Sequence, residues 1–147
     1  MKKSPIYFFK AFALLLVFSI MLWGCKDDDP NPLAQRINNL AGTWTVQSVT
    51  NDGTDVTNQF NGFQLAFTIE KTYTTTNGGN PWPASGTFDI QEDALDTIVR
   101  DGNTNITIVS ISDSSMSLRF QVNGIRSIAN LRSGITGSFT FSLTKTN

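Results

Sequence analysis

The stretch FQLAFTIE, residues 63–70, has an apolar side chain at every second position. Its odd-numbered residues are two Phe, a Leu and an Ile, and they alternate with polar or small residues. Successive side chains of a β-strand point to opposite faces, so this period of two predicts a strand with one buried face and one wet face. Residues 116–123 (MSLRFQVN) and 135–144 (ITGSFTFSLT) repeat the pattern, which favours an all-β fold.

Turn signals rich in Asn, Asp and Gly separate these runs at regular intervals. Asp101-Gly102, which lies between two apolar runs, is typical of a tight hairpin turn. The sequence therefore predicts about eight short antiparallel strands. They are expected near residues 43–50, 63–70, 72–77, 85–91, 95–100, 104–111, 115–123 and 135–145.

A small barrel accounts for these strands better than a β-sandwich, which remains the alternative. Each strand has one apolar face, and closing the sheet buries that face and removes the exposed edges. The outward residues are Thr, Ser, Gln and Arg, which cannot face lipid. We therefore expect the barrel to lie in water.

One short helix is expected before the first strand, at residues 33–40 (LAQRINNL). Its apolar residues at 33, 37 and 40 follow helical spacing, and Gly42 follows as a stop signal. A helix of this length is not stable alone. It must therefore dock on the barrel.

Residues 1–24 have the character of a secretion signal peptide. Three lysines precede the apolar run at residues 11–22 (AFALLLVFSIML), which has twelve residues. About 20 apolar residues are needed to span a bilayer, whereas a positive start and a shorter apolar run are typical of a signal peptide. Leu22-Trp23-Gly24-Cys25 then resembles the lipobox of bacterial lipoproteins. That resemblance implies that Cys25 is the first mature residue and carries lipid; a buried free cysteine is the alternative.

Residues 25–32 are expected to form an acidic tether between this anchor and a domain at residues 33–147. Lys26-Asp27-Asp28-Asp29 resembles the export signal of Bacteroidetes surface lipoproteins, and two prolines then stiffen the chain. The resemblance implies secretion across the inner membrane and anchoring to the outer membrane, exposed on the cell surface. A periplasm-facing position is the alternative.

Composition argues against several classes of function. The net charge of −1 is too small to attract nucleic acid. With no His and one Cys, a His- or Cys-based metal site or nucleophile is not expected. Glu92, Asp93 and Asp96 lie close together but lack the regular ligand spacing of a calcium loop. We therefore expect no enzyme activity, no cofactor and no metal.

The residues Leu40-Ala41-Gly42-Thr43-Trp44 resemble the opening Gly-x-Trp motif of lipocalins. The end of the chain, residues 139–145 (FTFSLTK), and the stretch 80–88 (NPWPASGTF) resemble lipocalin-like domains of Bacteroidetes lipoproteins. The resemblance implies that Trp44 points inward and plugs one end of the barrel. Larger lipocalins place an Arg from the last strand against this Trp; here that strand offers Lys145.

The barrel is expected to act as a binding module for a small apolar ligand. Barrels of this size either enclose one small ligand or are filled by their own side chains, and the bulky inward residues leave both alternatives open. If a cavity exists, its lining is apolar, as a lipid-like or aromatic ligand requires. The candidate lining residues are Trp44, Phe67, Phe120 and Phe141.

Two loops offer a second hypothesis, a structural or interaction module of a cell-surface assembly with a filled core. Trp82, if exposed, could stack on a sugar or contact a protein partner; alternatively it folds over the barrel mouth. Arg126 and Arg132 lie in residues 124–134, which could form a lid and contact an anionic group; a solvated edge is the alternative. Besides the membrane, the expected partners are this ligand or a surface protein or glycan, and we expect a monomer.

Overall fold

Nine antiparallel strands, one α-helix and one 3-10 helix make up the part of the chain described by the structure, a computed structural model covering residues 31–124 and 136–146. The elements are α2 (Pro32–Leu40), β1 (Gly42–Asn51), β2 (Thr54–Asp55), η1 (Thr57–Phe60), β3 (Gln64–Phe67), β4 (Thr72–Thr76), β5 (Ser85–Ile90), β6 (Thr97–Arg100), β7 (Thr104–Ile111), β8 (Ser115–Val122) and β9 (Gly137–Thr146).

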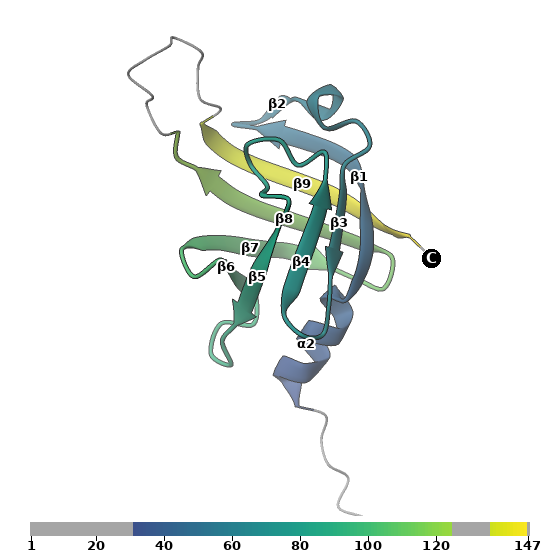
Figure 1. Cartoon of the computed structure of the whole chain (residues 1–147), viewed down its shortest axis with the longest axis vertical. Coiled ribbons are helices and arrows are strands. Elements are labelled where there is room, and N and C mark those ends of the chain that lie inside the picture. The colour runs from purple at the N-terminus through teal and green to yellow at the C-terminus, as the bar shows by residue number, and fades with distance from the viewer. Residues whose placement is uncertain (1–30, 125–135, 147) are drawn as a thin grey trace, which may run out of the picture.

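The strands close into a barrel because β1 pairs on both sides. Its first residues pair with β3, and residues 43–51 pair with β9 across a register shift between Val46 and Ser48. The remaining strands pair in chain order from β3 to β9, and the two-residue strand β2 forms an antiparallel hairpin with the end of β1 (Figure 1). The prediction of an all-β barrel of eight antiparallel strands is confirmed, and the sandwich alternative is wrong.

The strand boundaries agree closely with the alternation of apolar and polar residues, with one correction. Residues 63–70 were expected to form one strand with Ile69 inside, but β3 ends at Phe67. Thr68 to Lys71 form a turn, with a hydrogen bond from the Lys71 amide to Thr68 O at 3.2 Å, and Ile69 is 62% exposed. The apolar pattern thus continues two residues beyond the strand, where the turn rotates Ile69 outward.

Helix α2 docks on one end of the barrel, as expected for a helix that is too short to be stable alone. The Asn31 side chain caps the helix and accepts from the Leu33 amide at 2.9 Å. At the other end of the helix, Leu40 is fully buried, and its carbonyl accepts a 2.8 Å hydrogen bond from Trp44 Nε1. Trp44 therefore closes this end of the barrel, which we call the closed end.

Lys145 from β9 covers Trp44 at the closed end. Its Nζ lies 5.1 Å from the centre of the Trp44 ring, within the range of a cation–π interaction. Gly42 makes this approach possible, because a Cβ there would lie 2.6 Å from Lys145 Cε and because its φ of +127° disfavours other residues. Lys145 of the last strand thus covers the opening Trp, a pairing that the sequence alone left open.

Candidate functional site

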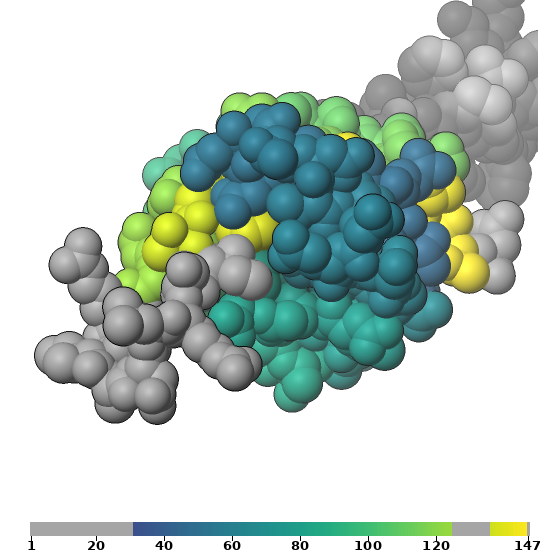
Figure 2. All heavy atoms as spheres, turned by 90° about the horizontal axis from the view of Figure 1, so that it is seen from above, coloured from purple at the N-terminus to yellow at the C-terminus, as the bar shows by residue number. Residues whose placement is uncertain are grey.

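Aromatic rings fill the opposite end of the barrel, which we call the mouth. The mouth is the end where the β1–β3, β4–β5 and β6–β7 connections lie, away from α2 (Figure 1). Figure 2 looks onto this end and shows atoms of the β1–β3 connection beside those of the β4–β5 region. Beneath them is a mouth cluster of buried rings, with centroids 5.0 to 6.4 Å apart: Phe60, Phe63, Trp82, Phe120, Phe139 and Phe141.

The four expected lining residues are all buried inside the barrel. Trp44 lies at the closed end, and Phe67 lies near it, because Phe67 pairs with Gly42 and its ring packs against Phe88 at 4.9 Å. Phe120 and Phe141 belong to the mouth cluster, stacked at 5.8 Å. The structure therefore places these four side chains at two ends of the interior.

Trp82 is 2% exposed, so the hypothesis of an exposed indole available to a sugar is wrong. Its ring packs edge-on against Phe120 at 5.3 Å and against Tyr73 at 5.9 Å. The alternative, in which Trp82 folds over the mouth, is the arrangement observed. Trp82 Nε1 has no hydrogen-bond acceptor among the described residues. Cys25, Arg126 and Arg132 lie outside the described residues, as do the signal peptide and most of the tether.

A groove of about 570 Å³ lies at the rim of the mouth. The β4–β5 connection, the β6–β7 hairpin and the end of β8 form it, and side-chain amides dominate its lining. The lining residues are Asn80, Pro81, Arg100, Asn103, Thr104, Asn105, Gln121, Val122 and Asn123. The groove therefore differs from the apolar interior cavity expected from the sequence, and none of the four expected lining residues is part of it.

Arg100 is the one buried charged side chain among the described residues, 8% exposed. Its guanidinium carbon lies 4.8 Å from the Trp82 ring centre and 5.3 Å from that of Phe120. Nη1 donates to Pro81 O at 2.9 Å, whereas Nε has no hydrogen-bond acceptor in the described part of the chain. Burial lowers the pKa of Arg100, but an arginine pKa is so high that the group stays charged.

Asp101 faces Arg100 from the hairpin turn, but it makes its hydrogen bonds elsewhere. Its Oδ2 lies 3.8 Å from Arg100 Nε and accepts from Tyr73 Oη at 2.7 Å. Its Oδ1 accepts from the Thr87 amide at 3.0 Å. Burial, together with the hydrogen bond to Asp101, raises the pKa of Tyr73, so this phenol remains a proton donor at neutral pH. Asp101 is thus fixed by Tyr73 and Thr87, and it contacts Arg100 only at ion-pair distance.

The sequence reasoning did not single out Arg100, although a signal for it exists. In β6 (TIVR), Ile98 is buried and Arg100 lies two residues later, on the same face. The period of two that identified the other strands therefore places this arginine on the inward side. A charged residue on the inward face next to an Asp-Gly turn is the pattern that would have identified the site.

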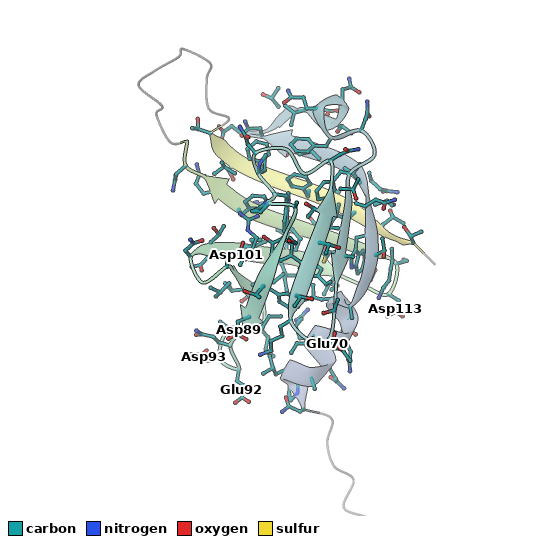
Figure 3. All side chains as sticks on the ribbon, in the orientation of Figure 1. Glu70, Asp89, Glu92, Asp93, Asp101 and Asp113 are labelled. Atoms are coloured by element: carbon teal, nitrogen blue, oxygen red, sulfur yellow. The ribbon has the colours of Figure 1, made fainter. Side chains whose placement is uncertain are left out.

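The carboxylates do not form a metal site in the described ranges. No group of three His, Cys, Asp or Glu side chains within residues 31–124 and 136–146 could hold a metal ion. Figure 3 shows Glu70, Asp89, Glu92 and Asp93 at the end of the barrel where α2 lies, whereas Asp101 lies farther from it. In the same residues, no helix combines the length and apolar character needed to cross a membrane.

A family model described as a lipocalin-like domain matches residues 40–118, which is more than half of the 147 residues. The match includes Trp44, Trp82 and Arg100, and it ends within β8. No curated protein and no solved structure matches the chain.

Proposed function

Because the chain belongs to the lipocalin-like domain family, we propose that it is a non-catalytic binding module whose small ligand occupies the groove at the mouth. The observation that carries this proposal is the groove itself. Its volume of about 570 Å³ falls within the range of about 300–1,000 Å³ found for small-molecule sites. It also presents several amides and one buried charge on a rigid barrel, which suits specific recognition.

The groove is a better candidate than the interior because rings occupy the interior beneath it. Phe120, Phe139 and Phe141 pack against one another, and Phe120 and Phe141 also pack against Trp82. A ligand among these rings would have to displace them, whereas the groove is already formed. Amide side chains both donate and accept hydrogen bonds, so the lining favours a ligand with hydroxyl, amide or carboxyl groups over a purely apolar one.

We expect Asn105→Trp to abolish ligand retention by filling the groove. Thr107→Trp is the matched control, because Thr107 is exposed two residues along the same strand and is not part of the lining. Full-length protein would be incubated with the small-molecule fraction of a cell extract and examined by native mass spectrometry. An adduct of a few hundred daltons on the wild type and on Thr107→Trp, absent from Asn105→Trp, is the expected result.

Two outcomes would contradict a ligand site at the groove. One is a wild-type protein that carries no adduct under these conditions. The other is an adduct that Asn105→Trp retains but that is lost when Phe120 is replaced by Trp, which would place an apolar ligand in the interior instead. The mass of any adduct also identifies the chemical class of the ligand.

For location, we propose that the module is a lipoprotein of the outer membrane, anchored through Cys25 and exposed on the cell surface. The support is the sequence of residues 1–32 and the position of α2. Cys25 precedes Asn31 by six residues, which span roughly 20 Å at most, and α2 leads directly into the closed end. An anchor at Cys25 would therefore hold the closed end near the membrane and leave the mouth groove facing away.

Cys25→Ser should release the protein from the membrane fraction. Each buried CH₂ of a lipid contributes about 0.8 kcal/mol, so several acyl chains hold the wild type firmly and their loss removes the attachment. The measurement is incorporation of an alkyne fatty acid by the full-length chain in bacterial cells, together with fractionation. Equal labelling of wild type and Cys25→Ser, or an unchanged membrane fraction, would reject the anchor while leaving the groove proposal intact.

A further inference from the structure

We propose that Arg100 receives an oxyanion of the ligand, a carboxylate or phosphate group, at the base of the mouth groove. This inference rests on the proposed function and names the chemical class of the ligand. It predicts that the ligand is a small polar molecule carrying one acidic group, whose hydroxyl or amide groups meet the amides of the lining.

Arg100 is buried, and most of its donors have no acceptor among the described residues. A guanidinium has five N–H donors, and the described residues give this one a single hydrogen bond, to Pro81 O at 2.9 Å. Leaving a buried charged group without partners is costly, and buried charges in proteins are usually paired. Within residues 31–124 and 136–146, Nε has no acceptor, and the Asp101 carboxylate at 3.8 Å is beyond hydrogen-bond distance.

The guanidinium of Arg100 is held in place before any ligand arrives. The rings of Trp82 and Phe120 pack against it, and Pro81 O fixes one nitrogen. Both rings belong to the mouth cluster, so they do not move independently of the barrel. A planar donor fork fixed in this way suits two oxygens of one acidic group, which arginine binds through parallel hydrogen bonds.

The acidic group nearest to Arg100 does not occupy its donors. Among the described lining residues of the groove there is no Asp or Glu, so no carboxylate competes for the guanidinium from the groove itself. Asp101 is the acidic neighbour of Arg100 in the described part of the chain, and its oxygens already accept from Tyr73 Oη and from the Thr87 amide. Asp101 therefore weakens the positive field without using the donors that a ligand needs.

Side-chain amides line the groove in which the acidic group of the ligand would lie. Asn103, Asn105 and Gln121 are exposed lining residues, each with a side-chain amide that can donate and accept. These amides can form hydrogen bonds with hydroxyl groups that lie beside the carboxylate or phosphate of a ligand. A matched set of sugars therefore tests the inference directly. Glucuronate, glucose 6-phosphate and neutral glucose share the same hexose ring and differ in whether they carry a carboxylate, a phosphate or no acidic group.

The experiment is a titration of ¹⁵N-labelled full-length protein in detergent with each of the three sugars, read at the Arg100 Nε–H and Trp82 indole resonances. We expect at least one anionic sugar to shift both resonances saturably and to bind at least about tenfold more tightly than glucose, because charge-assisted hydrogen bonds are about twice as strong as neutral ones. The preferred sugar then distinguishes a carboxylate ligand from a phosphate ligand.

Variants separate binding by Arg100 from a purely structural role. Arg100→Lys keeps the positive charge but loses the planar donor fork. We expect it to weaken binding of the anionic sugar at least about tenfold while the barrel stays folded. Arg100→Met removes the charge as well and should abolish the preference for the anionic sugar. Arg119→Met is the matched control, because Arg119 is exposed on β8 and contacts Thr140 outside the groove. It should bind like the wild type.

Each remaining outcome overturns the inference. Equal binding of glucose and the anionic sugars would leave the groove as a ligand site but reject an oxyanion at Arg100. An anionic preference that survives in Arg100→Lys and Arg100→Met would place the acidic group elsewhere. The inference would also be rejected if neither the sugars nor acetate nor inorganic phosphate produced an Arg100-dependent resonance shift. The adduct test with Asn105→Trp decides the groove proposal separately.

Discussion

Replacing Trp82 by Ala should lower the free energy of unfolding by about 3–5 kcal/mol, the range found when a large buried aromatic side chain is removed. Trp82 is 2% exposed and packs against Phe63, Tyr73, Phe120 and Phe141. Arg100 loses its closest ring at the same time, so one face of a buried cation is left uncovered. Chemical denaturation followed by circular dichroism measures the effect.

The cavity left by Trp82→Ala offers an internal control. A dry cavity lined by aromatic rings binds an apolar molecule of matching shape, and a ligand that binds only the folded state stabilises it. Indole should therefore raise the unfolding midpoint of Trp82→Ala and leave the wild type unchanged. A loss of less than about 1 kcal/mol, without any response to indole, would show that the mouth cluster does not depend on this ring.

The barrel itself could be predicted from the sequence because its strands are exposed on one face. Where one face meets the core and the other meets water, the apolar residues alternate, and β8 and β9 lie within two residues of the expected ranges. Alternation fails where the chain leaves the sheet. Ile69 continues the pattern into a turn, and η1 (Thr57–Phe60) was missed because its buried Phe60 is a single apolar residue in a polar run.

The candidate site was harder to predict, because it depends on contacts between segments that are distant in sequence. Whether Trp82 is exposed or buried is decided by Phe63, Phe120 and Phe141, which come from two other strands and a loop. Local sequence allowed both positions, since a Trp between two prolines suits a loop at the surface or over a mouth. The alternation of residues in β6 places Arg100 on the inward face, but whether it can bind a ligand depends on the groove that these segments form together.

The two ends of the barrel therefore use their tryptophans differently. At the closed end, Trp44 Nε1 donates to Leu40 O and the ring is covered by Lys145, so the polar and apolar parts of the side chain both have partners. At the mouth, the Trp82 ring is packed but its Nε1 has no acceptor among the described residues. At the closed end both parts of the tryptophan thus have partners, whereas at the mouth Trp82 Nε1 and Arg100 Nε lack acceptors among the described residues.

Replacing Trp44 by Ala should cost about 3–5 kcal/mol of unfolding free energy, as for Trp82, but without changing the groove. Trp44 is fully buried and anchors α2 through the 2.8 Å hydrogen bond to Leu40 O. The substitution should therefore also undock α2, which would be seen as faster hydrogen exchange of the backbone amides in α2. Binding of an anionic sugar by the folded fraction should equal that of the wild type, because no lining residue of the groove lies at the closed end.

The conservative variants Trp44→Phe and Trp82→Phe provide the sharper comparison, because each removes the same atoms from a buried ring. Trp44→Phe also leaves Leu40 O without its donor, and an unsatisfied buried carbonyl costs about 1–3 kcal/mol. Trp82→Phe loses no hydrogen bond among the described residues. We therefore expect Trp44→Phe to be the more destabilising of the two by about 1–3 kcal/mol in parallel denaturation curves. Equal losses would mean that the bond to Leu40 contributes nothing to docking α2, and that ring packing alone holds the closed end.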